Sequence, residues 1–278
     1  MEKTKRKYSK TDRLILGIGF TLLGLFVLSI AIPIVYVILA SFMDPTVLNN
    51  QGLSFRFKDW TIDAYRRVLE NEMIWRGFIN SFLYSLAFTV ISVLVTLLVA
   101  YPMSKKNFVG RKFFNLIFLF TMFFGGGMIP TFILINQLHL VNTVWAILLP
   151  GAFNVWNMIL ARTYYQSVPT ELREASAIDG AGKLSQFFHV TLPGIMPSFW
   201  FLLMTRIIGS LQMFDIVYTL TGGGPSRSTT TLVVYIYDTA FKSLGKTGYA
   251  TAMSEVLFGF IMIITVIMYT IMNKTSDD

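Results

Sequence analysis

The segment ELREASAIDGAGKLSQFFHVTLPGIMP, residues 171–197, decides the fold because it is a polar stretch inside an apolar chain. Apolar residues recur in it at helical spacing after Pro169, and Gly180 can end that helix. A second short helix from about Lys183 to His189 would stop before Pro193. We therefore expect two short helices joined by glycine, a compact body suited to a groove on a partner.

The composition around this segment is that of a membrane protein. Of the 278 residues, 54% are hydrophobic and 14% are charged, whereas soluble domains carry about 25% charged residues. The net charge of +8 does not indicate nucleic-acid binding, because the basic residues lie between apolar runs rather than on one polar face. The absence of cysteine excludes disulfides and thiolate metal sites.

Apolar runs long enough to cross a bilayer predict an all-α polytopic protein with six spans. The first run is too long for a cleaved signal and contains Pro33. Glycine and proline within 123–130 and 147–154 predict bends. The predicted spans are 14–40, 79–101, 113–135, 144–161, 198–221 and 250–272.

The distribution of Lys and Arg predicts that both termini are cytoplasmic. The strongest contribution comes from the basic tail 1–13, and most other Lys and Arg residues fall on the same side. This orientation places 41–78 and an outer loop, 222–249, outside the cell, and it places the loop 162–197 in the cytoplasm, within a core of residues 79–273.

The polar segment resembles the signature of permease subunits of binding-protein-dependent ABC importers. That signature reads Glu-Ala-Ala, three residues, Gly, nine residues, Ile, one residue, Leu-Pro. The spacing is complete here, with serine and valine as the two departures; the matching residues are Glu174, Ala175, Ser176, Gly180, Val190, Leu192 and Pro193. The form ELREASAIDGAG is similar to the carbohydrate branch, which includes the maltose and glycerol-phosphate importers.

Two other segments extend this resemblance. Residues 63–85 are similar to the family's amphipathic helix on the periplasmic side, and residues 214–241 are similar to its outer loop with the flanking helices. Residues 142–165 resemble one of the two permease types that usually pair, whereas the Gly-Gly-Gly-Pro loop resembles the other. The resemblance therefore leaves open which half of a heterodimer the chain would supply.

The resemblance implies the type I importer fold, with cytoplasmic coupling helices between the fourth and fifth spans. It implies that Glu174 pairs with a basic residue of a dimeric ATPase and that Gly180 forms the turn that seats the helix; a solvated glutamate and an ordinary helix-ending glycine are the alternatives. The residues expected to couple to the ATPase are Glu171, Glu174, Ala175, Ser176, Asp179, Gly180, Leu192 and Pro193.

The resemblance further implies a bacterial cytoplasmic-membrane assembly. Its other members would be a second, homologous permease and an extracytoplasmic solute-binding lipoprotein or periplasmic protein. A heterodimer of permeases is expected, and a homodimer stays open. The chain itself is not expected to be an enzyme or to hold a cofactor, because it lacks the G-x-x-x-x-G-K-[ST] phosphate loop. ATP and magnesium would bind the ATPase, and His139 and His189 are too far apart to predict a metal site.

Polar residues within the spans are candidates for lining a substrate path, since such residues are costly in lipid. Hydrogen bonding between helices is the alternative for each, and we favour it for Asp215. Gln212 and Asp215 are expected to share a helix face near the outer end of the fifth span, where Glu255 begins the sixth. The candidates are Asn154, Asn157, Arg206, Gln212, Asp215 and Glu255.

Three classes of function are compatible with these features. The first is a permease subunit that imports a carbohydrate, for example an oligosaccharide; the second imports another solute such as glycerol phosphate, a peptide or a polyamine. The third is an autonomous secondary transporter or a membrane enzyme. A secondary transporter would normally need carboxylates deep in the bilayer and an internal repeat, and the sequence shows neither. The polar segment also argues directly against this third class.

Overall fold

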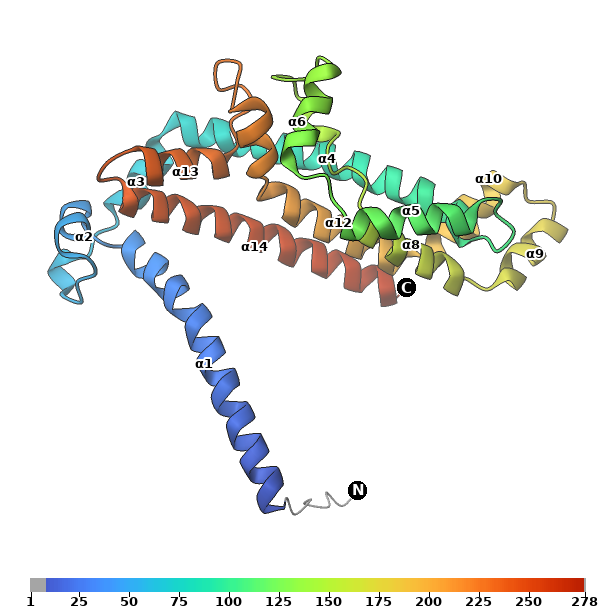
Figure 1. Ribbon diagram of the computed structural model, residues 1–278, viewed down its shortest axis with the longest axis horizontal. Coiled ribbons are helices and arrows are strands. Elements are labelled where there is room, and N and C mark those ends of the chain that lie inside the picture. The colour runs from blue at the N-terminus through green and yellow to red at the C-terminus, as the bar shows by residue number, and fades with distance from the viewer. Residues whose placement is uncertain (1–8, 278) are drawn as a thin grey trace. The chain divides into compact units, whose positions relative to one another are not determined.

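The computed structural model describes residues 9–277, which form helices with one isolated β-bridge between Met43 and Trp60. The chain divides into two compact units (Figure 1). Residues 9–70 and 239–255 belong to the first unit, and residues 71–238 and 256–277 to the second. The predicted all-helical fold is confirmed for the described residues.

The first unit begins with the long helix α1 (Lys10–Ser41), which contains the predicted span 14–40. None of its most apolar 18-residue window is buried, as expected for a helix that faces lipid. The predicted basic tail 1–13 falls mostly outside the described residues. The unit also contains α2 (Pro45–Gln51), η1 (Phe57–Asp59) and α3 (Asp63–Glu70).

A small core closes the turn that follows α1. Ala40 and Met43 are buried there, and Ser41 Oγ lies 2.7 Å from the Tyr65 hydroxyl oxygen. Helix α2 begins where it does because the Asp44 carboxylate accepts hydrogen bonds from the backbone amides of Thr46 and Val47.

The second unit holds the polar segment and most of the apolar helices. Its main elements are α4 (Glu72–Ser104), α5 (Arg111–Phe123), α6 (Met128–Gln137), α7 (Trp145–Leu148), α8 (Val155–Ser167), α9 (Thr170–Ile178), α10 (Lys183–Gln186), η2 (Phe187–Thr191), α11 (Leu192–Gly194), α12 (Met196–Leu211) and η3 (Val217–Thr221). Helices α13 (Leu232–Lys242) and α14 (Thr247–Asp277) contribute residues to both units.

Helix α4 packs against α8 and α12 through a stripe of small polar residues. Thr89 Oγ1 lies 3.5 Å from Ser210 Oγ of α12, which in turn lies 3.5 Å from the Ser85 carbonyl oxygen. Small side chains let membrane helices approach closely, and here the Thr89 and Ser210 hydroxyls lie within hydrogen-bonding distance across the contact. The buried members of the stripe on α4 are Ser81, Ser85, Thr89, Ser92 and Thr96.

The predicted count of six spans is not confirmed. Three helices are long and apolar enough to cross a bilayer by themselves: α1, α4 and α14. Two further spans arise only if bent helix pairs are counted, α5 with α6 at 116° and the helix 183–194 with α12 at 73°. The predicted span 144–161 is instead divided between α7 and α8, because Pro150 and Gly151 interrupt it.

The bends predicted from glycine and proline are confirmed. Helix α5 ends at Phe123 and α6 begins at Met128, after three glycines. The predicted fifth span, 198–221, is also interrupted, because α12 ends at Leu211 and the π-helix η3 follows only at Val217. Gln212 and Asp215 therefore do not share a helix face as predicted.

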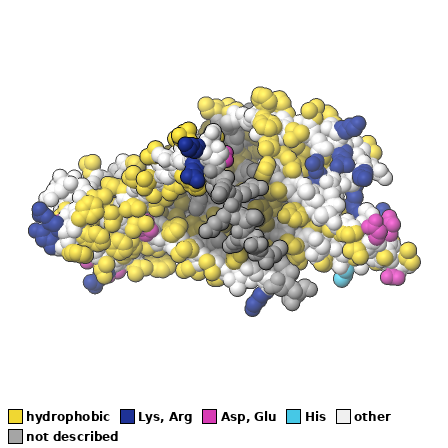
Figure 2. All heavy atoms as spheres, turned by 90° about the horizontal axis from the view of Figure 1, so that it is seen from below, with side chains coloured by type: hydrophobic (Ala, Val, Ile, Leu, Met, Phe, Trp, Pro, Cys, Tyr) yellow, Lys and Arg dark blue, Asp and Glu magenta, His cyan; other side chains and the backbone are white. Residues whose placement is uncertain are grey.

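Hydrophobic side chains cover much of the face seen in Figure 2. Basic and acidic side chains lie close together at the end that holds α9 and α10 in Figure 1. A membrane protein is expected to show this separation, because charged groups avoid the hydrocarbon region.

The glycine–threonine loop, residues 221–231, closes on itself within the second unit. Thr229 Oγ1 lies 2.7 Å from the Gly224 carbonyl oxygen and 2.9 Å from Thr221 Oγ1. Asn80 of α4 donates from Nδ2 to the carbonyl oxygens of Ser228 and Thr230, both at 3.0 Å. The loop's polar groups are thus satisfied inside the chain.

Candidate functional site

The polar segment, defined here as residues 170–194, starts with a helix that ends at glycine. Gly180 has φ +85°, a left-handed conformation that favours glycine. The Ala181 amide donates to the Ser176 carbonyl oxygen at 2.9 Å, and the Gly180 amide donates to that of Ala177 at 3.1 Å. These two bonds form a Schellman motif, so the prediction that Gly180 ends the first helix is confirmed.

The second helix of the segment is longer than predicted. It was expected to stop near His189, but α10 continues through the π-helix η2 into α11 and ends at Gly194. Pro193 lies in the first turn of α11, a position where its missing amide hydrogen is tolerated. The sharp bend lies at Ile195, directly after the end of α11 at Gly194.

Aromatic and aliphatic packing ties the end of the polar segment to the membrane helices. Phe187 lies edge-on to Tyr101 of α4, with ring centroids 5.4 Å apart. Leu192 packs against the same core, in which Ile195 is fully buried. Gly194 packs tightly here, because a Cβ at this position would meet Val168 Cγ2 at 3.0 Å. A displacement of η2 and α11 would therefore be transmitted to α4 and α12.

The beginning of the polar segment, in contrast, is exposed. Helix α9 has no buried residue, and Leu172 and Ile178 are 55% and 86% exposed. Leu184 and Phe188 are also exposed apolar residues of the segment. These side chains lie in a polar stretch rather than in a span, so burial in lipid does not explain them.

The predicted coupling residues separate into an exposed and a packed group. Glu171, Glu174, Ala175, Asp179, Gly180 and Pro193 are exposed. Ser176 is half-buried and donates its hydroxyl to the Arg173 carbonyl oxygen at 2.8 Å. Leu192 is half-buried in the core described above. The exposed group can contact another protein, whereas Leu192 contacts the core of the chain itself.

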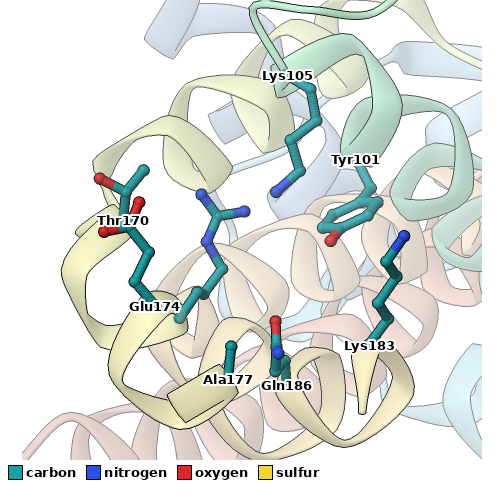
Figure 3. Close-up of a pocket in the computed structure, with 8 residues that line it drawn as sticks. Tyr101, Lys105, Thr170, Glu174, Ala177, Lys183 and Gln186 are labelled. Atoms are coloured by element: carbon teal, nitrogen blue, oxygen red, sulfur yellow. The ribbon is translucent and has the colours of Figure 1, made fainter. Parts of the chain in front are cut away.

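A cavity of about 460 Å³ lies between the end of α4 and the polar segment (Figure 3). Lys105 and Lys183 reach it on the side of Tyr101, and Thr170 and Glu174 lie together on the other side. The Lys105 ammonium group sits 4.4 Å from the centroid of the Tyr101 ring. The full lining is Tyr101, Lys105, Thr170, Arg173, Glu174, Ala177, Lys183 and Gln186.

Sequence reasoning missed the basic residues of this cavity. Lys105 directly follows α4, whereas Arg173 and Lys183 belong to α9 and α10, so no local motif connects them. The one available signal was that the residues after α4 and the polar segment were both predicted to lie on the cytoplasmic side.

The structure gives the asparagines among the predicted path residues a structural role. The Asn154 side chain caps α8 by accepting a hydrogen bond from the Asn157 amide at 3.0 Å. Asn157 is itself buried. Gln212 and Asp215 are exposed on either side of the break after α12, and Glu255 belongs to the first unit. Whether any of these residues lines a path stays a prediction.

Arg206 is the path candidate with the most unusual surroundings. Its guanidinium carbon lies 5.8 Å from the centroid of the Phe88 ring of α4. Nε and Nη2 are buried and have no hydrogen-bond partner among the described residues. A buried cation without a partner is costly, so this group is expected to meet an acceptor that lies outside the chain.

The apolar helices, the bent helix pairs and the charged end define an all-helical, multi-pass membrane protein. The family model described as the binding-protein-dependent transport system inner membrane component matches residues 92–277, and the chain belongs to this family.

Relatives and solved structures agree with this assignment. The polygalacturonan/rhamnogalacturonan transport system permease protein YtcP of Bacillus subtilis is 33% identical over 65% of the chain, and the chain spans 62% of its length. The arabinooligosaccharides permease protein AraQ of Halalkalibacterium halodurans is 34% identical over 70% of each. A chain of a bacterial ABC transporter involved in the import of the acidic polysaccharide alginate superposes with a TM-score of 0.77 at 26% identity, covering 97% of this chain and 99% of that one.

Proposed function

We propose that the chain is a membrane-spanning permease subunit of an ATP-driven importer for a carbohydrate, most simply an oligosaccharide delivered by an extracytoplasmic binding protein. The observation that carries the proposal is the polar segment: it exposes apolar side chains and Glu174 at one end and packs into the membrane helices at the other. A segment built in this way can act as a coupling element: a partner binds its exposed end, and a movement of the partner is transmitted through its packed end to the membrane helices. The printed names of the relatives support carbohydrate as the solute.

In this proposal the partner is a dimeric ATPase that binds ATP and magnesium on the cytoplasmic side, where both termini lie. Closure of the ATPase would push α9, and the push would pass through η2 and α11 to α4 and α12. A second, homologous permease would complete the path. This arrangement requires the Gly180 turn, which is exposed, to seat against the ATPase.

The substrate best supported within this class is an acidic oligosaccharide. Arg206 offers buried guanidinium nitrogens without an acceptor, and a carboxylate on a sugar would supply one. The similar alginate transporter is described as importing an acidic polysaccharide. Uptake of an oligogalacturonate and of its methyl ester by the assembled importer tests this; preference for the ester would contradict it.

The experiment that tests the proposal is co-purification from native membranes, followed by an ATPase assay. It compares the unchanged chain with Gly180→Arg, which adds bulk, and with Gly180→Ala, which adds the same backbone strain without the bulk. No atom lies within 4 Å of the added Cβ, so neither change crowds the permease itself. We expect the ATPase to accompany the unchanged chain and Gly180→Ala, and to be lost from Gly180→Arg while the second permease is kept. If the chain purifies alone, or Gly180→Arg keeps every partner and full activity, the importer proposal fails and an autonomous carrier becomes the better account.

A further inference from the structure

The cavity beside the polar segment carries an excess of positive charge that no described residue neutralises. Three cations line it, Lys105, Arg173 and Lys183, against one carboxylate, Glu174. None of the three forms an ion pair within the part of the chain that the structure describes. Glu174 lies beside Thr170, across the cavity from both lysines (Figure 3). The lining therefore leaves a net charge of +2 facing an open space.

The donors of the cavity are also incompletely used. Arg173 Nε is buried and has no hydrogen-bond partner among the described residues. Gln186 already donates from Nε2 to the Ala181 carbonyl oxygen at 2.8 Å, which holds the amide in place. The Lys105 ammonium group is held over the Tyr101 ring. A buried donor without an acceptor costs free energy, and an anion within the cavity would remove that cost.

We propose that this cavity binds a phosphate-type anion, with the headgroup phosphate of an anionic lipid or free inorganic phosphate as its source. A phosphate group has several acceptor oxygens and can accept hydrogen bonds from several cations at once, and three cations line this cavity. The volume of about 460 Å³ exceeds that of a phosphate group and leaves room for attached headgroup atoms. Lys105 directly follows the apolar helix α4, and a basic residue next to a membrane-spanning helix attracts anionic lipid headgroups.

The inference takes one point from the proposed function, which is that the polar segment lies on the cytoplasmic side of the membrane. The cytoplasmic leaflet is rich in anionic lipids. Bound phosphate at this position would join α4 to α9 and α10, and it would couple the lipid or phosphate supply to the polar segment.

The test uses the full-length chain, purified and reconstituted with phosphatidylglycerol or with phosphatidylcholine alone, and measures retained lipid by native mass spectrometry. The variants are Arg173→Gln and Lys105→Gln, and Lys106→Gln is the matched control, because Lys106 is adjacent, exposed and not part of the lining. We expect retained phosphatidylglycerol to fall about tenfold in the two cavity variants, as for the loss of one charge-assisted hydrogen bond, and to stay within about twofold in the control.

A second arm titrates inorganic phosphate into the chain held in phosphatidylcholine. Retention of phosphatidylglycerol that phosphate does not displace identifies the lipid headgroup as the source, and binding of phosphate that depends on Arg173 identifies the free anion. Either result supports the proposal. Equal retention in all variants with no phosphate binding overturns it. Because the chain is tested alone, anion binding can succeed even if no ATPase ever accompanies it, so the two proposals fail separately.

Discussion

The glycine–threonine loop and the beginning of the polar segment both contain glycine turns, but the threonines of the loop are buried within the chain and the beginning of the segment is exposed. In the loop, buried threonines and Asn80 satisfy the backbone around three glycines. In the polar segment, the Gly180 turn satisfies only its own helix end, and no residue of α9 is buried as a whole. The difference indicates which part of the second unit is complete in itself and which part awaits a partner. Stability measurements should respond to changes in the loop, and assembly measurements should respond to changes in the segment.

The largest loss of stability is expected from Gly223→Ala. The new Cβ would lie 2.4 Å from Thr230 Oγ1, and the residue has φ +82°. Overpacking and backbone strain together should lower the free energy of unfolding by about 2–4 kcal/mol, seen as a lower unfolding midpoint in detergent. Gly222→Ala is the control, because its Cβ meets nothing within 4 Å and only the strain of about 1 kcal/mol remains. Equal losses in the two variants would show that the loop is not tightly packed.

The next largest effect is expected from Leu172→Asp, and it should appear only in assembly. Leu172 is 55% exposed, so the unfolding midpoint should not change. If α9 docks on an ATPase, a charge at this position should reduce co-purification of the ATPase about tenfold, equivalent to about 1.4 kcal/mol. Leu244→Asp, at a fully exposed leucine outside the polar segment, should have no effect. A lower unfolding midpoint for Leu172→Asp would contradict the description of α9 as an unpacked helix.

A smaller contrast is expected between two hydroxyl deletions. Thr229→Val removes the hydroxyl near the Gly224 carbonyl oxygen in a buried loop, which should cost about 1–2 kcal/mol. Ser176→Ala removes a hydroxyl that bonds within its own helix, and its cost should stay below about 0.5 kcal/mol. Unfolding midpoints of both variants, measured together, give the comparison. Similar costs would show that the polar segment is as tightly built as the loop.

The smallest effect is expected at Asp44, in a third local turn. Hydrogen bonds from the Thr46 hydroxyl and the Thr46 and Val47 amides hold the pKa of this carboxyl below its ordinary value of 3.8. Because the folded pKa is the lower one, the cap stabilises α2 above the unfolded pKa, and this contribution is lost as pH falls through the folded pKa. Amide exchange of Thr46 and Val47, corrected for intrinsic rates, should therefore speed up only at acidic pH. An Asp44→Asn variant that keeps the same pH dependence would assign it to another group.

The sequence predicted the local features of the fold better than the spatial ones. Gly180 ended its helix as expected because a left-handed helix end depends on one residue and its neighbours. Within the predicted span 144–161, the break at Pro150 and Gly151 was also expected, because these two residues interrupt a helix locally. The second helix of the polar segment continued past His189 because the π-helix η2 connects α10 to α11, so that the backbone stays helical up to and beyond Pro193. Burial against α4 and α8 decided that outcome, and burial is not visible in a local pattern.

The candidate site shows the same division. The predicted coupling residues followed from a motif of fixed spacing, whereas the cavity cations Lys105, Arg173 and Lys183 come from separate parts of the chain. Arg206 was singled out because a charge within a span is costly. Its lack of a described acceptor could be learned only from the packing of α12 on α4.

The absence of buried residues in α9 also bears on how the protein is made. A helix that contributes nothing to a core adds little to the cooperativity of folding, so the membrane helices can reach their final packing while α9 remains solvated. Under the proposed function, insertion into the bilayer and recruitment of a cytoplasmic ATPase would then be separate events, and neither would have to wait for the other. A cell that makes this chain early could hold it in the membrane and set the number of working complexes through the supply of the ATPase.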